Sequence, residues 1–146
     1  MNEQRAVQFR TNSVRICIDS YDNEIVCGTI CGVALAEEIP FGGMSDFVVK
    51  MDEAFNKIGR PQPTRVLRSF GEADSYQSYK GTPDCFFTSA EIGQKRGAFR
   101  TMDVVMTSRH RAEWQGIITE VNGHIEGRFQ TILECMNLIG QILSDA

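Results

Sequence analysis

The sequence predicts an α+β fold in which two related strand–strand–helix units form one antiparallel sheet with both helices on one face. Two stretches of alternating apolar residues are each followed by a stretch of helical spacing, and the whole order recurs 88 residues further along. The units span about residues 14–58 and 102–146, and a middle segment, 60–100, joins them. A chain of 146 residues buries roughly two-thirds of its unfolded surface, so we expect a single domain, 1–146.

The first unit begins with a strand at residues 14–18, where every second side chain is apolar, as is typical of a strand with one buried face. A polar turn separates it from a second strand at 25–31. Helical spacing follows over 44–58, and Gly59 is a typical helix end. The apolar residues at that spacing are Met44, Phe47, Val48, Met51, Phe55 and Ile58.

The second unit repeats this order without a gap. Adding 88 to the apolar positions of the first strand gives Met102, Val104 and Met106, and adding 88 to Gly28 gives Gly116. Few aligned residues are identical, so the predicted duplication depends on the shared spacing of apolar residues, glycine and phenylalanine. The residues of the second helix that match the first are Ile132, Cys135, Met136, Ile139 and Leu143.

Each unit has a glycine in its second strand and a phenylalanine before its helix: Gly28 with Phe41, and Gly116 with Phe129. The missing side chain would let a bulky group, such as the phenylalanine, lie against the sheet. A β-bulge is the alternative interpretation. Both are structural roles.

The middle segment has mixed character. Residues 64–70 are compatible with an extra edge strand whose arginines discourage pairing with other chains. Residues 71–97 are rich in Gly, Ser, Asp, Lys and Thr, which favours a mobile excursion anchored by Phe86 and Phe87. A hairpin packed onto the main sheet is the alternative.

Three runs of the second unit, 99–106, 114–118 and 129–134, resemble small proteins of uncharacterised function that are common in Firmicutes. Those bacterial proteins carry a strand, then a strand that opens Trp-Gln-Gly, then a helix that opens with phenylalanine. Residues 109–113 differ, since shorter polar side chains form that turn in the relatives. The resemblance implies the architecture, and it assigns no activity, cofactor or site residue.

Composition excludes several classes of protein. Fifteen Lys and Arg against 19 Asp and Glu give a net charge of −4, so nucleic acid is not an expected partner. No apolar run has the length of a membrane span, and the N-terminal residues lack the apolar core of a signal peptide. We therefore expect a cytoplasmic protein without a membrane partner, with its five cysteines reduced.

We expect no catalytic residue, cofactor or metal. Cys27 and Cys31 share a strand face but are separated by about 13 Å along it, too far to bind one ion together. Cys85 lacks a nucleophile signature around it. The glycines at 42–43 precede a helix without the Lys-Ser/Thr that a phosphate-binding loop requires.

Two features favour protein partners. The first hairpin turn is acidic at 19–24 and its counterpart is basic at 109–111, which can steer association, with solvated surface as the alternative. The second helix also adds Leu133, Leu138 and Ile142 to its apolar arc. That arc then covers roughly 220° at 100° per residue, against roughly 120° in the first helix. Such a helix is covered on two sides, by the middle segment or by another subunit.

We therefore expect a non-catalytic protein-interaction or regulatory module that forms a homodimer, with Leu133, Leu138 and Ile142 in the interface. The alternative is a small-ligand sensor or a cryptic enzyme. Its pocket would lie between the sheet and the middle segment, with Trp114 as an apolar wall.

Overall fold

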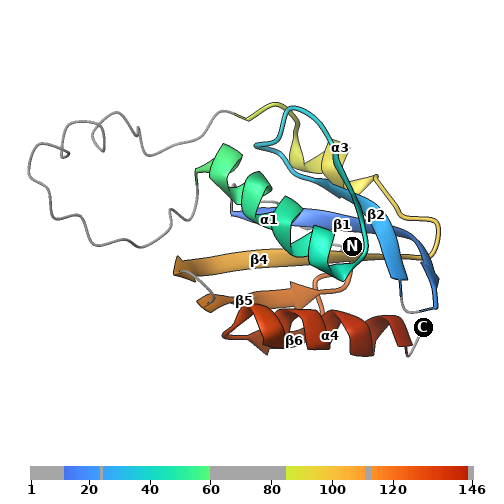
Figure 1. The fold of residues 1–146 in the computed structure, drawn as a ribbon. Coiled ribbons are helices and arrows are strands. Elements are labelled where there is room, and N and C mark those ends of the chain that lie inside the picture. Colours follow the sequence, from blue (N-terminus) through green and yellow to red (C-terminus); the bar gives the residue numbers. More distant parts are fainter. Residues whose placement is uncertain (1–11, 24, 60–84, 111–112, 145–146) are drawn as a thin grey trace, which may run out of the picture.

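The computed structural model describes residues 12–23, 25–59, 85–110 and 113–144. They form an α+β fold with one antiparallel sheet, which confirms the predicted class (Figure 1). The strands are β1 (Ser13–Asp22), β2 (Ile25–Cys31), β3 (Ile39–Gly42), β4 (Arg100–His110), β5 (Glu113–Thr119) and β6 (Ile125–Phe129), and the helices are α1 (Met44–Ile58), α3 (Ser89–Gly93) and α4 (Ile132–Ser144).

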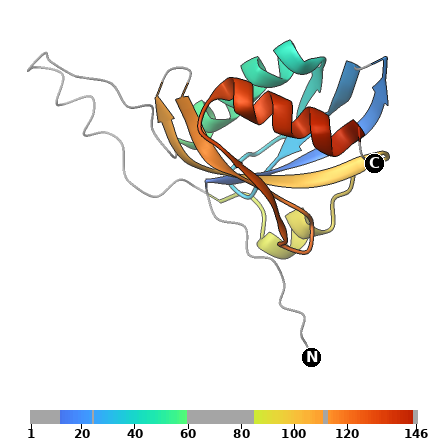
Figure 2. The ribbon, with the colours of Figure 1, turned by 90° about the horizontal axis from the view of Figure 1, so that it is seen from below.

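The six strands lie in the order β3-β2-β1-β4-β5-β6, so β1 and β4 pair at the centre and β3 and β6 form the edges. Helix α1 packs on β2 and β3, and α4 packs on β5 and β6. Figure 2 shows both of these helices on one face of the sheet and α3 on the opposite face. None of the helices in the described residues is long and apolar enough to span a membrane.

Each half has three strands before its long helix, so the predicted strand–strand–helix unit is wrong at this point. The missed strands, β3 and β6, are only four and five residues long and contain Pro40 and Gly127 respectively. Such short runs with proline or glycine are typical of turns. Phe41 and Phe129, predicted to precede the helices, lie within these strands and are buried in the core.

The pairings in the two halves agree when 88 is added to each residue number. Ile18 lies opposite Gly28 in the first half, Met106 lies opposite Gly116 in the second, and each ladder shifts its register at the next residue. Equivalent positions also meet at the centre, where Arg15 of β1 lies opposite residue 103 of β4. The β2–β3 and β5–β6 pairings share this relation along most of their length.

Gly116 of β5 has the predicted close approach to a phenylalanine and lies beside a ladder irregularity. Phe129 lies opposite Gly116, and a Cβ added at Gly116 would come within 2.9 Å of Cζ of that ring. The same Cβ would collide with the carbonyl oxygen of Val105. The register shift lies in the neighbouring strand, directly after Met106. The glycine therefore makes room for the phenylalanine beside an irregular ladder.

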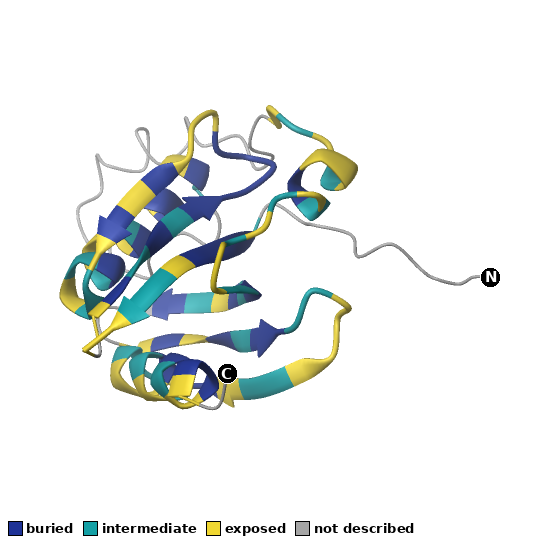
Figure 3. Ribbon diagram, turned by 90° about the vertical axis from the view of Figure 1, so that its right-hand side faces the viewer, coloured by how far each residue is buried: buried dark blue, intermediate teal, exposed yellow. Residues whose placement is uncertain are grey.

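The main core fills the space between the sheet and the two long helices, and Figure 3 shows buried residues on the strands and on the inward sides of both helices. Helix α1 has the predicted bounds, and four of its predicted apolar residues are fully buried: Phe47, Met51, Phe55 and Ile58. A second, smaller cluster on the opposite face of the sheet contains Cys17, Cys31, Val33 and Ile92.

The part of the middle segment at 60–84, which includes the predicted edge strand, lies outside the described residues. Residues 85–99 lie over the second face of the sheet and contain α3, which begins with a capping box between Thr88 and Glu91. Of the two predicted aromatic anchors, Phe87 packs against the small cluster and Phe86 is exposed.

Candidate functional site

A buried ion pair lies at the centre of the face that residues 85–99 cover. The Arg15 guanidinium donates from Nε to Oδ1 of Asp103 at 2.8 Å and from Nη2 to Oδ2 at 3.0 Å. Arg15 is 1% exposed and Asp103 is 2% exposed. Two parallel charge-assisted hydrogen bonds are the geometry in which a buried carboxylate and guanidinium satisfy each other best.

Arg15 also holds residues 85–99 against the sheet. Its Nη1 donates to the carbonyl oxygens of Gly93 at 2.9 Å and Lys95 at 3.0 Å, at and just beyond the C-terminal end of α3. Carbonyl groups at a helix end have no partner within the helix and cost free energy when they are buried unsatisfied. One side chain therefore joins β1, β4 and the covering segment.

The charge state of Asp103 depends on this contact. Burial raises the pKa of the Asp103 carboxyl, and the hydrogen bonds and charge of Arg15 oppose that rise. Arg15 thus stabilises the ionised carboxylate in the interior.

Two thiols lie beside the ion pair on the same face. The Cys31 thiol donates to the carbonyl oxygen of Arg15 at 3.8 Å. A hydrogen bond with Cys31 lowers the pKa of Cys17, whereas the same bond and burial raise the pKa of Cys31. Both thiols are buried with Ile92, and such cysteines pack as small apolar residues.

Cys27 of β2 is half-buried, whereas Cys31 of the same strand is buried and lies beside β1 in the sheet. Within the described residues, no group of three or more His, Cys, Asp or Glu side chains is placed to hold a metal ion.

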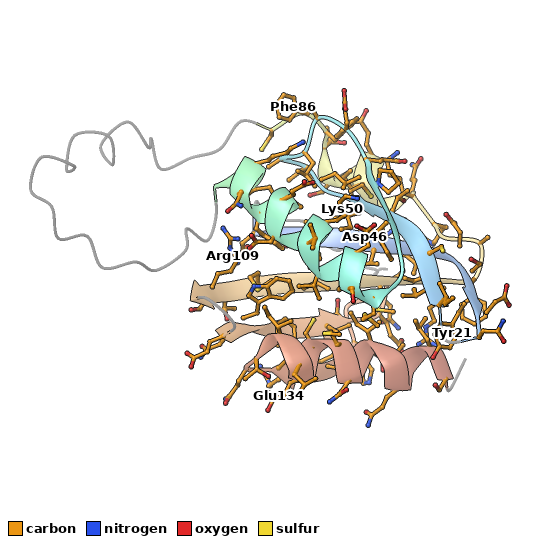
Figure 4. The ribbon with its side chains drawn as sticks, in the orientation of Figure 1. Tyr21, Asp46, Lys50, Phe86, Arg109 and Glu134 are labelled. Atoms are coloured by element: carbon orange, nitrogen blue, oxygen red, sulfur yellow. The ribbon has the colours of Figure 1, made fainter. Side chains whose placement is uncertain are left out.

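A second buried arginine joins β4 to α1. Arg109 Nη1 donates to Oδ1 of Asp52 at 2.8 Å, and Nη2 donates to Oδ1 of Asn56 at 3.0 Å. Its guanidinium carbon lies 5.9 Å from the centre of the Phe55 ring, and Figure 4 shows the side chain beside α1. Arg109 is 2% exposed, so both interpretations of the basic turn, steering of association and solvated surface, are wrong for this residue. Its positive charge pairs with Asp52 of the same chain.

The three predicted interface residues of α4 have different environments. Leu133 is 63% exposed, Leu138 is half-buried, and Ile142 is buried in the main core. A Cβ added at Gly127 of β6 would lie 2.8 Å from the methyl groups of Leu138, so Leu138 covers that glycine. The edge strand β6 therefore covers part of the wide apolar arc of α4.

Trp114, the predicted ligand wall, is buried in the main core. It projects towards the face that carries the long helices, whereas residues 85–99 pack on the small cluster of the opposite face.

The solvent-facing side of α4 is poor in charge. Glu134 is the one charged residue of this helix, whereas the exposed residues of α1 include Asp52, Glu53 and Lys57. Gly140 also opens a small space on α4, because a Cβ added there would meet no atom within 4 Å. Leu133 projects from this side of the helix. The exposed residues of α4 are Leu133, Glu134, Asn137, Gln141 and Ser144.

The first turns of α1 and α4 are held by equivalent acids. The Gly42 N–H donates to Oδ2 of Asp46 at 3.0 Å, and the Gln130 N–H donates to Oε1 of Glu134 at 2.7 Å. Lys50 Nζ lies 3.1 Å from Oδ1 of Asp46, and Figure 4 shows both side chains on α1. The hydrogen bond from Gly42, and then that from Lys50, lower the pKa of the Asp46 carboxyl.

This shift predicts a loss of stability in acid. A carboxyl whose pKa is lower in the folded state stabilises the fold above its ordinary pKa of about 3.9, and the contribution is lost as the pH falls below that value. We expect the free energy of unfolding of Asp46→Asn to fall less steeply than that of the wild type between pH 5 and about pH 3. Urea unfolding at several pH values measures this dependence of the free energy of unfolding on pH. Asp22→Asn, at the exposed end of β1, is the control. Parallel slopes for Asp46→Asn and wild type would contradict the assignment.

Sequence patterns did not single out Arg15 or Asp103, because a charged residue in an alternating strand is usually solvated, and they placed Arg109 in a surface turn. One signal was present: Arg15 and Asp103 are of opposite charge and 88 residues apart, so the predicted symmetry places them at equivalent positions. Comparisons with protein-family models, with curated proteins and with solved structures give no match.

Proposed function

We propose that the chain is a cytoplasmic, non-catalytic protein-interaction module that forms a homodimer, with the exposed side of α4 in the interface. The observation that carries the proposal is the charge-poor side of α4, from which Leu133 projects at 63% exposure. Depletion of charge around an exposed apolar side chain distinguishes the centre of protein interfaces from the remaining surface. A surface with one charged side chain, Glu134, sets little like charge against its own copy, as a twofold interface requires.

We further propose that the two halves are duplicates. The shared pairing register, the equivalent glycines and the equivalent acids Asp46 and Glu134 support this relation. Under it, α1 and α4 are counterparts, and their difference in surface charge marks the helix with the additional role. Helix α1 retains five charged residues: Asp46, Lys50, Asp52, Glu53 and Lys57.

Replacing Leu133 with glutamate tests the proposal. The wild-type chain is expected to sediment as a dimer at micromolar concentration, and Leu133→Glu should raise the dimer dissociation constant by roughly tenfold or more, because the interface would bury an unpaired charge. Sedimentation equilibrium measures this constant, and circular dichroism shows whether the variant is folded. Leu133 is a better site than Leu138, whose side chain also packs within the chain.

Val49→Glu is the matched control. Val49 is an apolar residue of α1 with 56% exposure, close to that of Leu133, so the two variants add the same charge at similarly exposed positions of counterpart helices. The control should remain a dimer. A monomeric wild type, or equal effects of the two variants, would overturn the proposed interface.

A further inference from the structure

We infer that the homodimer forms by edge-to-edge pairing of β6 with β6 of a second copy, which joins two six-stranded sheets into one. This inference rests on the proposed homodimer and names the element that associates. It follows from a difference between the two edges of the sheet, β3 and β6. An edge strand presents backbone N–H and C=O groups that can pair with another strand.

Two hydrogen bonds show which backbone groups face outward at these edges. The N–H of Gly42 bonds to Asp46, and the N–H of Gln130 bonds to Glu134, so neither N–H is used to pair with the neighbouring strand. The Gly43 N–H, one residue further along, instead bonds to the carbonyl oxygen of Val26 in β2. Because backbone groups alternate in direction along a strand, residues 40 and 128 also direct theirs outward.

The two edges differ at this position. Pro40 stands on β3, and proline has no N–H, so it cannot donate to an added strand. Arg128 stands at the equivalent position of β6, where it retains its N–H and is exposed. The β3 edge is therefore blocked at its centre, whereas the β6 edge is open at Arg128, two residues from the register shift at Glu126. Ile125, 43% exposed at the start of β6, adds apolar surface there.

The charges of β6 favour pairing with its own copy. Glu126 and Arg128 flank Gly127, so antiparallel pairing about Gly127 sets the arginine of each copy opposite the glutamate of the other. Cross-strand pairs of opposite charge stabilise a sheet, whereas pairing about Arg128 would oppose two arginines. Oε2 of Glu126 lies 3.3 Å from Nη2 of Arg100 in the same chain. This ion pair keeps the Glu126 carboxylate close to the sheet.

The same pairing explains the surface of α4. Paired strands are separated by about 4.8 Å, and α4 packs on β5 and β6. If two sheets join at β6, the axes of the two α4 helices lie about 10 Å from each other. This is a usual packing distance between helices. The open strand edge and the charge-poor helix are then parts of one interface.

Arg128→Pro tests the inference, since it places in β6 the residue that stands at the equivalent position of β3. Its N–H faces outward, so the β5–β6 ladder loses no donor. We expect a folded chain with unchanged circular dichroism and a dimer dissociation constant raised roughly tenfold or more, while Arg128→Ala stays dimeric. Sedimentation equilibrium distinguishes these results. A wild-type monomer would overturn the proposed function, whereas a dimeric wild type with a dimeric, folded Arg128→Pro would overturn only the β6 interface.

Charge exchange provides a second test that does not depend on proline. Arg128→Glu alone opposes two acids across the strands and should weaken the dimer, and the double variant Glu126→Arg/Arg128→Glu should restore it. Failure of Arg128→Glu to weaken the dimer, or of the second change to restore it, would contradict pairing about Gly127.

Discussion

Replacing Arg15 with methionine is expected to lower the free energy of unfolding by about 3–5 kcal/mol, because Asp103 is left buried without its partner. The side chains are similar in length, so most of the loss is electrostatic. The carbonyl groups of Gly93 and Lys95 also lose one of their two side-chain donors, since Arg96 donates to both as well. Without Arg15, only the smaller effect of the Arg96 charge opposes the rise that burial causes in the pKa of the Asp103 carboxyl, and we expect the variant to be less unstable in mild acid than at neutral pH.

Urea unfolding measures this loss, and Arg96→Met is its matched control. Arg96 donates to the same two carbonyl oxygens, those of Gly93 and Lys95, but is exposed, so its removal should cost no more than about 1 kcal/mol. The double variant Arg15→Met/Asp103→Leu should recover much of the single variant's loss, because no charge then remains buried. Equal stability of Arg15→Met and Arg96→Met would contradict the structural role of the ion pair.

Replacing Gly116 with alanine is expected to cost about 3 kcal/mol or more, at the upper end of the range for an overpacked core. The added methyl group would meet the carbonyl oxygen of Val105, which belongs to the backbone of β4 and cannot move without shifting that strand. It would also press on the buried Phe129 ring. Because Gly28 has the same pairing and its Cβ would collide with the carbonyl oxygen of Cys17, Gly28→Ala should have a comparable effect.

Thermal and urea unfolding measure both glycine variants, and Gly140→Ala is the control. Gly140 lies inside α4 with open space around its Cα, so alanine there should stabilise the chain by about 0.5–1 kcal/mol. If the change at Gly116 cost as little as an ordinary surface substitution, the close approach of β4 and β5 would be wrong.

Local patterns predict the central strands and α1 well because burial there has a regular period. Val14, Ile16 and Ile18 alternate along β1, and the apolar residues of 44–58 follow the turn of a helix. The edge strands have no such period: β3 contains one proline and one glycine in four residues. They form because β2 and β5 offer a partner, and this information lies outside the local sequence.

The candidate site was predictable only in part. Leu133 stands out from sequence as an apolar residue beyond the ordinary arc, and it is exposed. The burial of Arg15 depends on residues 85–99, which are distant in sequence and cover it only in the folded chain. The open edge at Arg128 becomes visible only by comparison with Pro40, once β3 and β6 are known to be strands.

The most direct measurement is sedimentation equilibrium of the wild-type chain beside Arg128→Pro, at equal concentration and with circular dichroism to confirm folding. Association through β6 predicts a wild type with twice the mass of one chain and a folded variant with the mass of one chain. A wild type that remains a monomer at high micromolar concentration would contradict the homodimer, and two dimers would place the interface elsewhere.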